Sequence, residues 1–250
     1  MKKYFISCIC LIVLLISSLA MVLAEQNDLT EEILFRKIPW GTSATDFVSA
    51  MNKDNLGGRL QEANRLKTWE LVDGKYNYLN EVENMGFKYS SSPKGASVAS
   101  IPIKAIEASF LYTFDRDNVY KDENRSSLYK ACYELDPVDS ATTYSILVDK
   151  LTSIYGKGKK QTIADTSWSS SKGSFITKYE AMVWYGANDT GVRLYMECNV
   201  YDNPDLEKEY KCLRLEYGKT NSNELFKDIT SAMSRVQTRE MLSNDDVDGL

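Results

Sequence analysis

The strongest constraint on the fold is a two-residue hydrophobic period that begins near Val98. From Glu107 to Phe114, apolar side chains alternate with more polar ones, which is typical of a strand that buries one face. Further segments with strand patterns lie at 127–135, 176–185, 191–201 and 209–217. Strands with one buried face are characteristic of antiparallel sheets, and each needs another layer packed on that face.

Amphipathic helices are expected to provide this layer. The clearest helix is predicted over 141–155, with Ser140 as its N-cap and Gly156 as its left-handed terminator. Its apolar residues recur at helical spacing: Tyr144, Leu147, Val148, Leu151, Ile154 and Tyr155. The predicted fold class is therefore α+β, with antiparallel sheet packed by amphipathic helices.

Three more helices are predicted. Ser43 and Asp46 form a capping box that opens one of them. Another is expected near 75–85, ending at Gly86, and the last over 222–240. A helix thus precedes a run of strands twice, which is consistent with two helix-then-sheet units.

The two ends of the chain differ from the rest. Lys2 and Lys3, a following apolar run and the small residue Ala24 form the pattern of a cleaved secretory signal peptide. We therefore divide the chain into a signal peptide (1–24), a flexible leader (25–34), a first helix-plus-sheet unit (35–137), a second unit with a C-terminal helix (138–241) and an acidic tail (242–250). After cleavage no segment has the length of an apolar membrane span, so we expect a protein that is secreted or held in the cell envelope.

The chain contains no histidine, and this excludes several kinds of chemistry. Ser-His-Asp and Cys-His catalysis, histidine-ligated zinc and haem held by a proximal histidine all need the missing residue. The net charge of −5 argues against a nucleic-acid partner, which would need a basic face. No cofactor is expected. No metal is expected either, because Asn244, Asp246 and Asp248 match the start of a calcium loop without its final carboxylate.

The hairpin formed by the last two predicted strands allows a register to be predicted. With both apolar faces on one side, Cys198 is expected opposite Leu213, and Glu197 opposite Arg214. Cys198 and Cys212 then point to opposite faces of the sheet. No disulfide is expected between them, because a disulfide needs converging side chains.

The outer face of this hairpin is the candidate binding surface. It carries Tyr195, Glu197, Tyr201, Tyr210 and Arg214, with Tyr201 expected opposite Tyr210. Tyrosine and arginine at this density suit the binding of a protein or a glycan, since aromatic rings offer contact area at low entropic cost. The alternative is an ordinary sheet face that is solvated or covered by a helix.

We therefore expect a non-catalytic binding protein whose partner is a protein or glycan of the cell envelope or exterior. The alternative is a carboxylate-dependent hydrolase of envelope or extracellular glycans, which needs one carboxylic acid of raised pKa and one base or nucleophile. Its candidate residues are Glu107, Glu134, Glu180, Glu197 and Glu216, and the sequence singles out no pair of them. A cleft with two facing carboxylates would favour the hydrolase, and an exposed flat patch of tyrosine and arginine would favour the binding protein.

Two motifs carry a resemblance to known proteins. Phe35-Arg36-x-Ile38-Pro39-Trp40-Gly41-Thr42-Ser43 and Leu151-Thr152-x-x-Tyr155-Gly156 resemble a family of uncharacterised exported proteins of Gram-positive anaerobes, over most of residues 35–217. These motifs are an anchor, a helix cap and a helix stop, and the resemblance implies no known activity. The helix-then-sheet order is also similar to that of the β-lactamase inhibitor protein and of small envelope-assembly lipoproteins, in architecture alone.

Overall fold

The computed structural model describes residues 31–72, 76–115, 118–136, 139–169, 173–199 and 209–244. Within this part of the chain the fold is α+β and mostly sheet. The predicted signal peptide, most of the leader and the end of the acidic tail lie outside the described residues. No helix of the described part is both long enough and apolar enough to cross a membrane.

A helix followed by a run of strands occurs twice along the chain, and a further helix follows the second run. The helices are α2 (Ala44–Lys53), α3 (Ser140–Tyr155) and α4 (Ser222–Asn244), with a 3-10 turn at Glu123–Arg125. The strands of the large sheet are β1 (Arg59–Val72), β2 (Tyr76–Ser91), β3 (Ser97–Val98), β4 (Ile101–Leu111), β7 (Ser127–Leu135), β8 (Lys159–Ser169), β9 (Gly173–Gly186), β10 (Thr190–Asn199) and β11 (Glu209–Lys219). A small separate pair is formed by β5 (Thr113–Phe114) and β6 (Val119–Tyr120).

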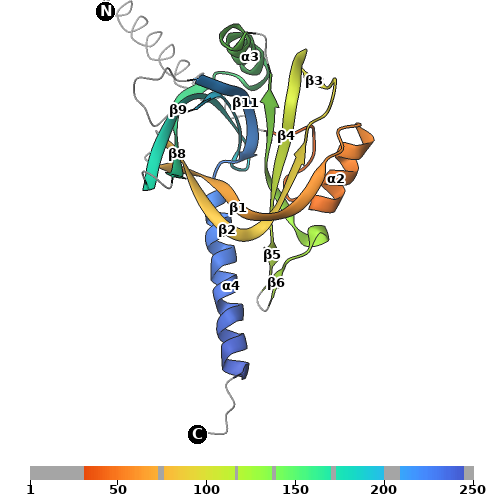
Figure 1. Cartoon of the computed structure of the whole chain (residues 1–250), viewed down its shortest axis with the longest axis vertical. Coiled ribbons are helices and arrows are strands. Elements are labelled where there is room, and N and C mark those ends of the chain that lie inside the picture. The colour runs from red at the N-terminus through yellow and green to blue at the C-terminus, as the bar shows by residue number, and fades with distance from the viewer. Residues whose placement is uncertain are drawn as a thin grey trace, which may run out of the picture.

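The nine-stranded sheet closes on itself through β2 (Figure 1). Its strand order is β1-β2-β8-β9-β10-β11-β7-β4-β3, and β2 also pairs with β4. Residues 76–79 of β2 pair in parallel with β8, whereas residues 86–91 pair antiparallel with β4. The strands from β8 round to β4 therefore form a ring that the long, curved β1–β2 hairpin completes.

Each half of the chain contributes one meander to this ring. The order β1-β2-β4-β7 comes from the range 35–137 and follows α2, while β8-β9-β10-β11 comes from 138–241 and follows α3. The two meanders meet through their last strands, because β7 and β11 pair antiparallel. The contact of β2 with β8 joins them a second time, so strands of both ranges form one continuous sheet.

The main hydrophobic core lies on the outer face of the ring, under α2 and α3 (Figure 1). Phe47 of α2 and Leu147 of α3 pack there against alternate residues of the strands, such as Leu194 and Leu213. Phe35, from the segment before α2, is fully buried in the same core and contacts the ring of Tyr133. The sheet is therefore stabilised mainly from outside the ring.

A second, smaller core lies at one end of the ring, where α4 begins. Phe226 and Ile229 of α4 pack there with Leu66, Leu111 and Tyr129. The rest of α4 continues away from the body of the molecule (Figure 1). The first turns of α4 thus cover this end of the ring with apolar side chains.

The predicted helix ends are largely confirmed. The Ser43 hydroxyl accepts a hydrogen bond from the Asp46 N–H at 3.1 Å and donates one to the Asp46 carboxylate, so the capping box opens α2. Gly156 ends α3 with a φ of 74°. The N-cap of α3 is Asp139 and not Ser140, because the Asp139 carboxylate accepts two backbone N–H groups of the first turn.

The helix predicted near 75–85 is wrong, because this segment belongs to β2. Gly86 does not end a helix but allows β2 to approach β4 closely: a Cβ at Gly86 would lie 1.8 Å from the carbonyl oxygen of Phe110. Its neighbour β1 was not predicted either. A bulge between Ala63 and Arg65 breaks the two-residue period that marks a strand.

The predicted hairpin register is wrong by two residues. Met196, not Cys198, lies opposite Leu213, and Tyr195 lies opposite Arg214. Matching apolar faces fixes only whether even residues oppose odd ones, and a shift by two residues preserves that match. The prediction that the apolar residues of both strands share one face is therefore confirmed, whereas the predicted residue pairs are wrong.

Candidate functional site

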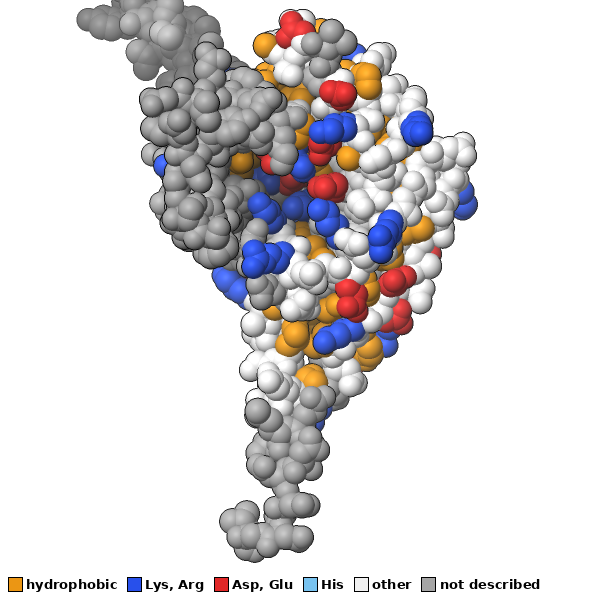
Figure 2. All heavy atoms as spheres, in the orientation of Figure 1, with side chains coloured by type: hydrophobic (Ala, Val, Ile, Leu, Met, Phe, Trp, Pro, Cys, Tyr) orange, Lys and Arg blue, Asp and Glu red, His pale blue; other side chains and the backbone are white. Residues whose placement is uncertain are grey.

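The inner face of the ring is polar and surrounds a cavity of about 250 Å³. Along β7 and β11, every second side chain turns away from the main core, and Lys130, Cys132, Arg214 and Glu216 reach the cavity in this way. Among the described lining residues, five are cations and three are carboxylates. Figure 2 shows lysine and arginine side chains gathered in the hollow of this face, with acidic side chains between them.

Arg214 is the centre of an ion-pair network that joins four strands. Its Nε donates to Glu197 Oε2 at 2.5 Å, its Nη1 to Glu107 Oε2 at 3.3 Å and its Nη2 to Glu134 Oε2 at 3.4 Å. These carboxylates come from β10, β4 and β7. Three carboxylates around one guanidinium use most of its five N–H donors, so Arg214 is held rigidly in place.

Neighbouring lysines extend this network. Lys88 Nζ lies 3.2 Å from Glu107 Oε1, and Lys104 Nζ lies 2.7 Å from Glu134 Oε1. Burial would raise the pKa of Glu107, but Lys88 and Arg214 outweigh it and leave that pKa below its usual value. Glu107 is therefore ionised at neutral pH.

A second ion pair lies deeper, between Arg193 and Glu216. The Arg193 side chain is fully buried, and its Nη2 lies 2.5 Å from Glu216 Oε1. The Tyr195 hydroxyl donates to Glu216 Oε2 at 3.2 Å. Burial alone would raise the pKa of Glu216, but Arg193, with help from Lys130 and Arg214, lowers it to about 2. Glu216 thus stays charged although it is buried.

Lys130 differs from the other cations of the cavity. Within the described part of the chain, its side chain has no hydrogen bond and no ion pair. Burial lowers its pKa, while Glu216 and Glu107 act in the opposite direction without contacting it. Arg193 lowers the pKa further, and Cys132 is the remaining titratable group that influences it. Lys130 is therefore a cavity amine that holds its proton less strongly than an ordinary lysine.

Part of the cavity lining is aromatic and apolar. Tyr179 and Tyr195 line the cavity with their ring centroids 5.9 Å apart. Behind them, Ile163, Ala181 and Val183 form a small cluster on the inner faces of β8 and β9. The cavity lining therefore has a charged part and an apolar part.

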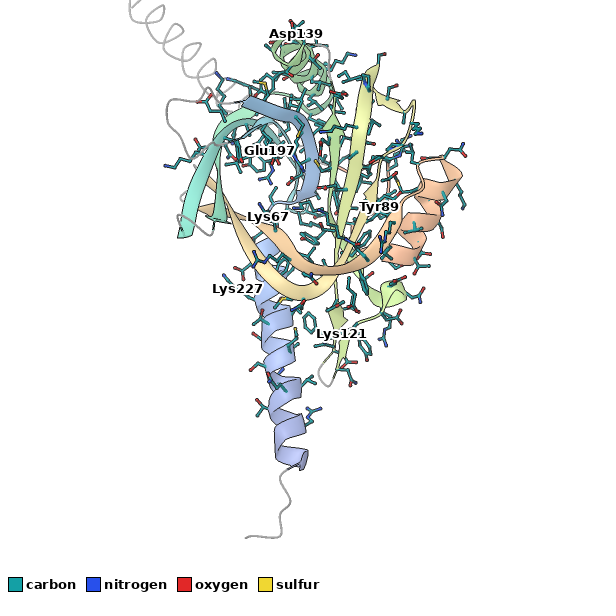
Figure 3. The ribbon with its side chains drawn as sticks, in the orientation of Figure 1. Lys67, Tyr89, Lys121, Asp139, Glu197 and Lys227 are labelled. Atoms are coloured by element: carbon teal, nitrogen blue, oxygen red, sulfur yellow. The ribbon has the colours of Figure 1, made fainter. Side chains whose placement is uncertain are left out.

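Three of the five predicted binding residues, Tyr195, Glu197 and Arg214, line this cavity and do not lie on an exposed face. Tyr195 is only 5% exposed, and Glu197, which points into the ring (Figure 3), accepts a hydrogen bond from Arg214. Tyr201 lies outside the described residues, and of Tyr210 the structure describes only the backbone, opposite Cys198. The expectation of a flat outer surface at Tyr195 is therefore wrong, because closure of the sheet turns this face inward.

Cys132 and Cys212, the two cysteines whose side chains the structure describes, are buried and free. The Cys212 thiol lies 3.5 Å from Glu197 Oε2, and burial raises its pKa to about 12. Burial also raises the pKa of Cys132, against the effect of nearby Arg214. The absence of a Cys198–Cys212 disulfide is confirmed, and neither thiol is a reactive thiolate at neutral pH.

Sequence reasoning missed Lys130 and Arg193 as residues of the site. A usable signal was present, since charged residues share the face that does not join the main core, four positions apart in Lys130 and Glu134 and in Arg193 and Glu197, and two apart in Arg214 and Glu216. On a solvated face such a row is ordinary. On the inner face of a ring it becomes a buried network.

No metal site is found among the described residues, and no related protein is found by comparison. Among the described residues, no group of three or more cysteine, aspartate or glutamate side chains is arranged to hold a metal ion. Comparison with family models, with curated proteins and with solved structures finds no match for this chain.

Proposed function

We propose that the protein is a non-catalytic binding protein that takes up a small anionic molecule in the cavity of the ring. The observation that carries this proposal is Lys130, a cavity cation that has no ion pair within the described residues. Each of the carboxylates at the cavity, Glu107, Glu197 and Glu216, is already bound to an arginine. A ligand that completes the charge balance must therefore bring a negative charge to Lys130.

The size and composition of the cavity support a small ligand with two kinds of surface. Its volume of about 250 Å³ is slightly below the usual range of small-molecule sites, roughly 300–1,000 Å³. The acidic group of such a ligand would face Lys130, and its apolar part would lie against Tyr179 and Tyr195. A few polar groups within an otherwise closed site fix orientation and specificity.

The alternative, a carboxylate-dependent glycan hydrolase, gains no support from the site. Such an enzyme needs one carboxylic acid whose pKa is raised so that it can donate a proton. The pKa values of Glu107 and Glu216 are both lowered, and each residue is bound to a cation. These carboxylates act as permanent charges that position arginine side chains.

The pattern of residues 1–24 supports export, and so we place the proposed binding outside the cytoplasm or in the cell envelope. We also propose that 35–137 and 138–241 are two helix-then-sheet units whose meanders together enclose the site.

Isothermal titration of the purified mature chain with lactate, a small carboxylate, tests the proposal. Wild type should bind lactate, and Lys130→Met should weaken the affinity about tenfold or more, the effect of losing one charged hydrogen bond of roughly 1.5–3 kcal/mol. Lys150→Met is the matched control, because Lys150 is an exposed lysine on α3 outside the cavity. Equal binding by all three proteins, or none by wild type, would overturn the proposed function.

A further inference from the structure

We propose that Lys130 forms an imine with a carbonyl group of the ligand, so that the preferred ligands are small 2-oxo acids. This inference rests on the proposed function, because it concerns the same cavity and the same anionic class of ligand. It assigns to Lys130 a covalent role in addition to its charge.

The surroundings of Lys130 leave space for such a bond. Its two cross-strand neighbours are Gly218 on β11 and Ser109 on β4, and both are small. A Cβ at Gly218 would lie 3.6 Å from Lys130 Cγ, so a longer side chain there would press on the lysine stem. Together with the adjoining cavity, this space lets a carbonyl carbon approach the amine.

The state of the amine also suits this reaction. Only the neutral amine attacks a carbonyl, and burial lowers the pKa of Lys130, which raises the neutral fraction. An ion pair would hold the proton on the amine, and Lys130 has none within the described residues. Lys88, by contrast, forms an ion pair with Glu107, with 3.2 Å between Nζ and Oε1, so its amine is not free to attack a carbonyl group.

The reaction balances without any further reactant. The Nζ lone pair attacks the carbonyl carbon and the C–N bond forms, while one N–H proton passes to the carbonyl oxygen to give a neutral carbinolamine. The hydroxyl group then takes up a proton from solvent and leaves as water, so that the C–O bond breaks and a protonated imine remains. Its positive charge lies near the carboxylates of Glu216 and Glu107, which influence Lys130 electrostatically and stay ionised in the cavity.

The 2-oxo acids combine the two properties that the cavity selects. Their carboxylate is compensated by the excess of cations over carboxylates among the described lining residues. Their carbonyl group lies directly beside that carboxylate, so one small molecule brings both to Lys130. A short apolar substituent would face Tyr179 and Tyr195.

Reductive trapping with pyruvate tests the inference. The mature protein is incubated with pyruvate and borohydride, digested, and analysed by mass spectrometry for a reduced pyruvyl group on the peptide that carries Lys130. Lactate, which has no reactive carbonyl, is the ligand control. Lys130→Arg is the decisive variant, because it keeps the positive charge but cannot form the imine, and Lys150→Met controls for surface lysines.

The two proposals fail in different ways. The inference predicts labelling at Lys130 in wild type and in Lys150→Met, and no labelling of Lys130→Arg. Lactate binding by wild type without labelling by pyruvate, or labelling spread evenly over surface lysines, would overturn the imine and leave the binding function intact. Failure of wild type to bind lactate would overturn the binding function itself.

Discussion

Replacement of Glu216 by glutamine tests the buried ion pair at the centre of the site. The side chains of Arg193 and Glu216 are 0% and 5% exposed, with 2.5 Å between their bonded atoms. Glutamine keeps the shape of the side chain but removes its charge, and leaves the Arg193 guanidinium buried without its carboxylate. Breaking a buried pair in this way costs about 3–5 kcal/mol of unfolding free energy.

The pKa of Glu216 gives an independent magnitude. The folded value is about 2, and an unfolded glutamate titrates near pH 4.3, so the charged form contributes about 3 kcal/mol at pH 7. Because the folded pKa is the lower one, this contribution is complete above about pH 5 and is lost as the pH falls toward 2. At pH 3 about half of it remains, roughly 1.4 kcal/mol.

Urea unfolding of wild type and Glu216→Gln at pH 7 and pH 3 measures both quantities. The difference in unfolding free energy should be about 3 kcal/mol at pH 7 and about half of that at pH 3. Glu224→Gln is the control: Glu224 pairs with Lys227 on the exposed side of α4, and such a surface pair contributes about 0.5 kcal/mol or less. A loss below about 1 kcal/mol at pH 7, or the same loss at both pH values, would refute the reasoning.

Three further results are expected. Phe226→Ala should lower the unfolding free energy by about 3–5 kcal/mol in urea titrations, because it opens a cavity in the core under α4, whereas the exposed Leu225→Ala should cost about 1 kcal/mol or less. In native protein at pH 8, Cys212 should react with iodoacetamide far more slowly than in urea, since burial raises its pKa to about 12. Titration with lactate at pH 6 and pH 9 should show weaker binding at the higher pH, because burial lowers the pKa of Lys130 and its charged fraction falls as the pH rises.

The parts of the fold that could be predicted are those where one strand face packs on the main core. The strand at 127–135 matches β7 because Ala131, Tyr133 and Leu135 face that core while Cys132 does not. β1 and β2 could not be predicted in the same way. The bulge in β1 lets Ala63 and Leu66 pack into the same small core although they are three residues apart, a spacing that is typical of helices.

The candidate site was predicted only in part, and the reason is the curvature of the sheet. Sequence alternation shows that Tyr195, Glu197 and Arg214 share a face, and the structure brings them to one cavity. The alternation does not show whether that face turns toward the inside or the outside of the ring. Closure depends on β2, which pairs with β8 at one end and with β4 at the other, and such long-range pairing leaves no pattern in a single strand.

The position of the main core explains how the protein tolerates a charged interior. Because α2 and α3 bury their apolar residues on the outer face of the ring, the inner face is free to carry polar groups. Buried ion pairs such as Arg193–Glu216 are poor sources of stability, and apolar residues of similar size would fold as well or better. Their presence is therefore better explained by what they do for the cavity. They keep it polar and hold fixed charges around Lys130, so that a ligand of the proposed kind would meet the amine in a site that is already ordered.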